Sequence, residues 1–167
     1  MYIRPEHPSD IAKIYELTTV AFAPMPFSYG TEADIINSLR DRNELVLSLV
    51  AVDGDEVVGH IAFSCITING HHKGWHGLGP VSVTPTKQRQ SIGSQLIYEG
   101  LDRLRMQGAA GCTLVGDPKY YNRFGFKSDG KLTYQNIPVE YVQWLSFGKQ
   151  SVSGVLEFSS AFSVSKL

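Results

Sequence analysis

The chain has little of what marks several classes of protein. Its 15 basic and 16 acidic residues leave a formal net charge of -1, so the basic excess typical of nucleic-acid-binding proteins is absent. No apolar run approaches the roughly 20 residues that a membrane-spanning helix requires. The first residues, from Met1 to Glu6, do not join a basic stretch to an apolar one, so no signal peptide is predicted. We therefore expect a cytoplasmic protein without a nucleic-acid or membrane partner.

Cysteine is also scarce, with Cys65 and Cys112 as the only two in the sequence. Each lies in an apolar stretch typical of a strand, so we expect two buried free thiols in a reducing compartment. Neither cysteine has a partner at the spacing of a metal ligand. The adjacent His71 and His72 lack a third ligand at usable spacing. No metal site is predicted.

The bulk composition is that of an ordinary globular protein. Hydrophobic residues make up 43% and charged residues 19% of the 167 positions, whereas a disordered chain would have fewer apolar residues and a larger charge imbalance. The length suits one domain with a sizeable core. We expect this single domain over residues 1–158 and a frayed, serine-dotted tail over residues 159–167.

Apolar residues recur at helical spacing in several segments. The first helix is expected to be capped by Ser9 and to end near Phe22, before two prolines. Thr31 and Asp34 form a capping-box-like pair at the start of the second helix. The predicted helices cover residues 9–22, 31–40, 91–107 and 117–123.

Strand-like segments alternate with these helices and give a mixed α/β domain. Asp53-Gly54 and Asn69-Gly70 are hairpin signals, so antiparallel strands come first. Residues 81–115 then form a βαβ crossover, whose two strands are expected to be parallel. Pro80 predicts a bulge or a locally unpaired edge, because proline cannot donate to a ladder. The predicted strands cover residues 3–4, 45–52, 57–68, 78–83, 112–115, 139–147 and 155–158.

The most informative segment is residues 81–94, where a strand passes through a short polar loop into a long helix. The first turn of a helix has backbone N–H groups without an internal partner and the positive end of the helix dipole. Gly93 and Ser94 are small enough for a phosphate to approach, and Lys87 and Arg89 add positive charge. This segment alone is equally compatible with a cap at Ser91 and a packing role for Gly93. Neither a triphosphate P-loop nor a three-glycine dinucleotide fingerprint is present.

Two motifs of this sequence resemble those of the GNAT superfamily of acyl-CoA-dependent N-acetyltransferases. Gln88, Ser91 and Gly93 match the family's Gln/Arg-x-x-Gly-x-Gly/Ala motif, except that serine replaces the first glycine. The aromatic segment 120–126 matches a second family motif, and with residues 116–118 before it is similar to a subgroup labelled YhbS-like.

The resemblance implies an α+β fold with a mostly antiparallel central sheet, one parallel βαβ crossover and helices on both faces. In that family the fourth and fifth strands splay apart, and the pantetheine arm of the cofactor lies between them. The implied activity is transfer of an acetyl group from acetyl-CoA to a primary amine, by direct attack in a ternary complex. The alternative is an acyl-CoA-binding sensor without turnover, which the serine at position 91 keeps open.

The resemblance also implies roles for individual residues. The backbone N–H of Val81 would polarise the thioester carbonyl, and Tyr121 would protonate the departing thiolate. Phe27 and Tyr29 would line the pocket of a small-molecule or peptide amine. The oligomeric state, monomer or homodimer, is left open. The implied cofactor-binding residues are Val81, Ser82, Val83, Gln88, Arg89, Gln90, Ser91, Ile92, Gly93, Ser94, Asp117 and Tyr120.

Several of these residues also have ordinary structural interpretations. Tyr121 could pack as an aromatic, Phe27 and Tyr29 could form a local apolar plug, and Asp117 is expected to cap a helix. No general base stands out, and a water relay is the alternative. The candidates for the base are Glu32, His60, Ser64, His71, His72 and His76.

Overall fold

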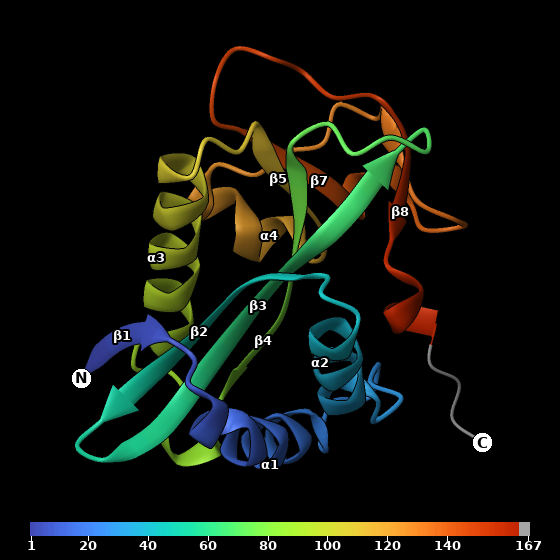
Figure 1. Cartoon of the computed structure of the whole chain (residues 1–167). Coiled ribbons are helices and arrows are strands. Elements are labelled where there is room, and N and C mark those ends of the chain that lie inside the picture. Colours follow the sequence, from blue (N-terminus) through green and yellow to red (C-terminus); the bar gives the residue numbers. More distant parts are fainter. Residues whose placement is uncertain (164–167) are drawn as a thin grey trace.

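An open sheet of eight strands forms the centre of the computed structural model, which describes residues 1–163 (Figure 1). The strands are β1 (Tyr2–Pro5), β2 (Leu45–Asp53), β3 (Glu56–Ile68), β4 (Trp75–Val83), β5 (Gly111–Val115), β6 (Leu132–Thr133), β7 (Val142–Ser146) and β8 (Gly154–Phe158). The helices are α1 (Ile11–Phe22), α2 (Glu32–Asp41), α3 (Ile92–Met106) and α4 (Pro118–Tyr121). Within the described residues, no helix combines the length and apolar composition that crossing a membrane requires.

The strand order confirms the mostly antiparallel sheet with one βαβ crossover. The main path runs β1-β2-β3-β4-β5-β7, and β8 pairs with the far end of β3. Neighbours are antiparallel except β4 with β5, which α3 connects, and β6 with β8. The β6–β8 pair joins only two residue pairs, and so short a strand leaves no period-two signal in the sequence.

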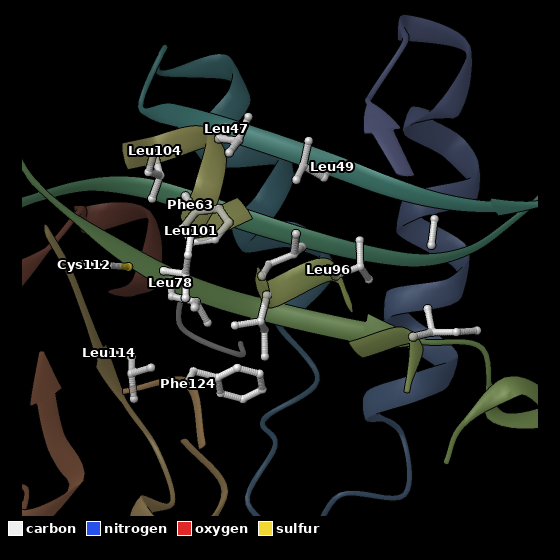
Figure 2. Close-up of a cluster of buried hydrophobic side chains, with 14 of the residues drawn as sticks. Leu47, Leu49, Phe63, Leu78, Leu96, Leu101, Leu104, Cys112, Leu114 and Phe124 are labelled. Carbon is white, nitrogen blue, oxygen red and sulfur yellow. The ribbon is translucent and has the colours of Figure 1, made fainter. Parts of the chain in front are cut away.

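Helices cover both faces of the sheet, as expected (Figure 1). Along β2, Leu49 and Ala51 face the cluster built by α3, while Val50 and Val52 face the cluster with α1 and α2. This alternation follows from the period of two in a strand. Figure 2 shows the larger cluster, in which leucines of α3 pack against leucines of β2 and Phe63 of β3. The α3 residues are Leu96, Leu101 and Leu104, and the β2 residues are Leu47 and Leu49.

The contact between α3 and β3 depends on a glycine. A Cβ atom added at Gly100 would lie 2.3 Å from the Phe63 ring, so only glycine lets the helix backbone sit this close. The close contact holds α3 firmly, and the start of the same helix forms part of the site described below.

One predicted helix cap is wrong, and a second has the predicted position without the side-chain hydrogen bonds of a capping box. Ser9 lies within a 3-10 turn (Pro8–Asp10), and α1 begins after it at Ile11. Asp10 makes the local hydrogen bonds instead, accepting from the His7 amide at 2.7 Å and from the Arg4 guanidinium at 2.7 and 3.2 Å. Thr31 is the N-cap residue of α2, as predicted, but its side chain makes no capping hydrogen bond, and Asp34 accepts from the Tyr15 hydroxyl at 2.9 Å.

The frayed tail is also wrong for residues 159–163. After β8 the chain forms a 3-10 helix (Ser160–Ser163), and the Ala161 side chain is fully buried against Ile35 and Leu39 of α2. The short apolar pair Ala161-Phe162 fixes this segment, although serines surround it. The rest of the predicted tail lies outside the described residues.

Two strands have boundaries that differ from the predicted ones. The strand predicted from residue 78 already begins at Trp75, while residues 139–141 form a 3-10 turn before β7.

Both cysteines are free, as expected, but only Cys112 is buried, and Cys65 is half-buried. Burial raises the pKa of each thiol.

Candidate active site

The sheet splits between β4 and β5. These parallel strands pair only at Trp75, His76 and Gly77. Beyond Gly77, β4 runs on to Val83 without a strand partner among the described residues on that side, and the rest of β5 pairs with β7. The split therefore leaves a row of backbone groups of β4 free to meet a ligand.

A bulge accompanies the split. Ile61 of β3 pairs with Val81, but Phe63 pairs with Leu78, so β4 has one extra residue around Gly79 and Pro80. This confirms the irregularity predicted from Pro80. The bulge bends the strand away from regular pairing at the point where the sheet opens.

An apolar cavity of about 1080 Å³ occupies this opening. We call it the split-sheet cavity. Its walls come from β4, from the end of β5, from α4 and from two connections outside the sheet. The lining residues are Ala21, Phe22, Met25, Phe27, Leu78, Gly79, Pro80, Val81, Ser82, Val83, Gln88, Val115, Gly116, Asp117, Tyr120, Tyr121, Ile137, Pro138 and Tyr141.

A second cavity of about 380 Å³ lies at the start of α3. We call it the cradle. It shares Val83, Gln88 and Tyr120 with the split-sheet cavity, so the two adjoin. The lining residues are Val83, Lys87, Gln88, Arg89, Ser91, Ile92, Gly93, Ser94, Tyr120 and Arg123.

Backbone amides form the floor of the cradle. Arg89 and Ser91 both have positive φ, 64° and 66°, which turns the loop so that successive amides can point to one side. The first amide that donates within α3 is that of Gln95, to the Ser91 carbonyl at 3.0 Å. The amides of Ile92, Gly93 and Ser94 therefore have no partner inside the helix.

The floor is open above Gly93. A Cβ atom added there would have no neighbour closer than 3.8 Å, the Tyr120 hydroxyl and a Val83 methyl. Arg123 lies at the rim, with its guanidinium 4.6 Å from the Tyr120 ring centre. Lys87 is the less available cation, because its ammonium lies 3.3 Å from an Asp53 carboxylate oxygen. An anion of phosphate size has both the space and the donors it needs here.

Tyr121 is held in the wall of the split-sheet cavity. Its ring makes edge contacts with Tyr120 and Phe126, at centroid distances of 4.9 and 6.1 Å. A Cβ atom at Gly116 would lie 2.6 Å from the ring, so this glycine provides the space for the tyrosine. Burial, with a smaller contribution from Tyr120, raises the pKa of Tyr121 to about 12. The phenol is therefore protonated at neutral pH.

The chain is similar to members of one known family over most of its length. A family model described as an acetyltransferase (GNAT) domain matches residues 2–128. The chain belongs to the GNAT acetyltransferase family. The uncharacterized N-acetyltransferase YhbS of Escherichia coli K12 is 38% identical over 128 residues, which cover 76% of this chain and 74% of YhbS.

Two solved GNAT structures are similar over nearly the whole chain. A GNAT acetyltransferase from Brucella melitensis, in complex with acetyl-CoA, has a TM-score of 0.87 and 46% identity, covering 96% of this chain and 97% of that one. The structure of E. coli YhbS in complex with CoA has a TM-score of 0.89 and 32% identity, covering 99% of this chain and 93% of that one. The GNAT fold expected from the sequence is confirmed.

Within this GNAT fold, most of the predicted site residues lie together. All of the predicted cofactor-binding residues except Gln90 line one of the two cavities. Phe27 lines the split-sheet cavity, but Tyr29 lines neither. Asp117 caps α4, as expected, by accepting from the Lys119 amide at 2.9 Å.

The candidate general bases are not brought to the site. None of the six side chains lines either cavity. His60 is fully buried, with Nε2 2.8 Å from the Ser48 hydroxyl, and desolvation lowers its pKa to about 4. Glu32 accepts from the Ser28 hydroxyl. Within the described residues, no group of three or more His, Cys, Asp or Glu side chains is arranged to hold a metal ion.

Sequence reasoning missed several lining residues. Arg123 stands inside the recognised aromatic motif, where a basic residue beside two tyrosines was a usable signal. The other missed residues, at the end of α1 and in the two outer connections, had no such signal, because they meet only in the folded chain: Phe22, Met25, Ile137, Pro138 and Tyr141.

Proposed function

We propose that this GNAT protein transfers an acetyl group from acetyl-CoA to a primary amine of a small molecule or peptide. One observation carries the proposal: an amide-floored cradle adjoins an apolar cavity in a split sheet, and a protonated tyrosine lies in the wall of that cavity. Such an arrangement can bind a ligand with an anionic end and a long, weakly polar arm. Acetyl-CoA has both.

The pyrophosphate of the cofactor would bind in the cradle. The amides of Ile92, Gly93 and Ser94 would donate to it, and the guanidinium groups of Arg89 and Arg123 would add positive charge. The relatives from B. melitensis and E. coli were solved with acetyl-CoA and CoA, which supports this assignment.

The pantetheine arm would follow the unpaired edge of β4 from Val83 to Val81. In a ternary complex, the neutral amine nitrogen attacks the thioester carbonyl carbon, whose oxygen accepts a hydrogen bond from the Val81 amide. The C–S bond then breaks, and the sulfur leaves with the bonding electrons. Tyr121 donates its hydroxyl proton to that sulfur and regains one from the former amine nitrogen through water.

No candidate base lines the cavity, so we propose that the ammonium loses its first proton to water. The same observation favours one alternative, an acyl-CoA-binding sensor without turnover. We further propose that the protein acts in the cytoplasm, as a single domain that includes residues 159–163, and as a monomer or homodimer.

A free-thiol assay with acetyl-CoA and a panel of primary amines separates enzyme from sensor. We expect thiol release that depends on the amine and exceeds the hydrolysis seen without it. Binding of CoA without amine-dependent release across the panel would support the sensor and overturn the transferase.

A further inference from the structure

The part of the split-sheet cavity that the cradle does not share has almost no charged side chains in its lining. Its outer walls are the end of α1 and the connection after it, with Phe22, Met25 and Phe27, and the segment before β7, with Ile137, Pro138 and Tyr141. Neither segment contributes to the cradle. With the cradle and the edge of β4 assigned to acetyl-CoA in the proposed function, these two walls are the surfaces left for an acceptor.

Side chains that are charged at neutral pH are nearly absent from this cavity. Among its lining residues, all within the described part of the chain, there is no lysine or arginine, and Asp117 is the only carboxylate. That carboxylate already accepts from the Lys119 amide at 2.9 Å. A second positive charge on an acceptor would thus meet mostly apolar surface, with a single carboxylate, already the cap of α4, as its one possible partner in the lining.

Phe27 is suited to contact an apolar group. Its side chain is 72% exposed although it lines the cavity, so a ligand that covers the ring would remove apolar surface from water. Burial of apolar surface contributes about 25 cal/mol per Å², and aromatic rings add edge or stacking contacts.

We propose that the acceptor is a primary amine on an apolar, preferably aromatic, group without a second positive charge, and that Phe27 selects it. This inference rests on the proposed acetyl transfer. It separates one class of amine from polyamines and aminoglycoside-like acceptors, for whose further charges this cavity offers one carboxylate at most.

The test compares two primary amines, 2-phenylethylamine and 1,4-diaminobutane. Thiol release from saturating acetyl-CoA gives kcat/KM for each amine, and calorimetric titration into CoA-saturated protein gives binding without turnover. We expect 2-phenylethylamine to be at least about tenfold better in kcat/KM, a difference of ~1.4 kcal/mol, and to bind more tightly.

Phe27→Asp should reverse the preference, because it removes the ring and adds a carboxylate at the wall. We expect it to lower kcat/KM for 2-phenylethylamine about tenfold and to raise it for the diamine. Tyr29→Asp is the matched control. It places the same charge in the same connection at a side chain that is 77% exposed and lines neither cavity, so the preference should stay as in wild type.

The outcomes separate this inference from the proposed function. A kcat/KM for the diamine as high as that for 2-phenylethylamine, or tighter binding of the diamine, would overturn the inference and leave acetyl transfer intact, as would equal effects of the two aspartate variants. CoA binding without binding of either amine would also overturn it. A protein that neither binds CoA nor releases thiol would overturn the proposed function, and the inference with it.

Discussion

The cradle and the split-sheet cavity are neighbours built in opposite ways. The cradle consists mainly of one stretch, Val83 to Ser94, and presents backbone amides and cations. The split-sheet cavity gathers side chains from five segments between Ala21 and Tyr141 and is apolar. A site made of backbone tolerates side-chain change but not bulk or wrong charge, whereas a site made of converging side chains can be retuned residue by residue. Affinity for the cofactor and choice of acceptor should therefore respond to different mutations.

Of the substitutions considered, Tyr121→Phe should have the largest effect on turnover, while the cradle should keep its affinity for CoA. The ring contacts with Tyr120 and Phe126 survive, and no hydrogen bond joins the Tyr121 hydroxyl to another described residue. General acid catalysis is worth about 10²–10⁴-fold, so we expect turnover to fall within that span. CoA affinity should change by less than about tenfold. Unchanged turnover with a good acceptor would show that the tyrosine only packs.

The pH profile gives an independent test of the same tyrosine. Because burial raises its pKa to about 12, Tyr121 stays protonated through pH 10, where an ordinary phenol is half ionised. Ionisation of Tyr121 should therefore not lower kcat until the pH approaches about 12. A fall centred near pH 10 in wild type, absent from Tyr121→Phe, would contradict this assignment.

Gly93→Asp should have the largest effect on the cradle. A Cβ atom fits there, with its nearest neighbours at 3.8 Å, so the fold should survive while a carboxylate enters the anion site. We expect CoA affinity to fall about 100-fold, or ~2.7 kcal/mol, by calorimetry. Gly93→Ala is the control and should cost less than about tenfold. Equal losses in both variants would indicate that bulk, and not charge, is what the cradle excludes.

Gly116→Ala should weaken turnover and leave the cradle untouched. The new Cβ would lie 2.6 Å from the Tyr121 ring, so the ring must move away from its position in the wall. A misplacement of about 1 Å can cost about 100-fold in rate, and for the smaller displacement expected here we predict that kcat falls about tenfold. CoA affinity, measured in parallel, should stay within about threefold. If kcat and CoA affinity fall together, the cradle and the split-sheet cavity do not respond independently to mutation.

Ser91→Gly should have the smallest effect. Serine at a φ of 66° is disfavoured by roughly 1–2 kcal/mol, but glycine also gains freedom in the unfolded chain. We expect the free energy of unfolding to change by less than about 1 kcal/mol and CoA affinity by less than about threefold. Ser91→Ala keeps the unfavourable φ without the hydroxyl. A large loss of affinity in both variants would assign the hydroxyl itself to the ligand.

The sequence predicted the two regions unequally, for a physical reason. The cradle is continuous in the chain, so Gln88, Ser91 and Gly93 reported it directly, and the hairpin signals at Asp53-Gly54 and Asn69-Gly70 reported the strands around it. The outer walls of the split-sheet cavity depend on tertiary contact between segments far apart in the chain, and of their residues only Phe27 was predicted from the sequence. Ala161 shows the same limit, since its burial depends on α2 and not on its neighbours in sequence.

Titration of the wild-type protein with CoA tests the central claim most directly, that cradle and split-sheet cavity together bind one ligand. Calorimetry should give a dissociation constant in the micromolar range or below, with ATP and NAD at least about tenfold weaker, because neither carries a pantetheine arm for the edge of β4. No heat and no thermal shift with CoA would contradict the account. Binding of NAD as tight as that of CoA would also contradict it, in favour of a dinucleotide site.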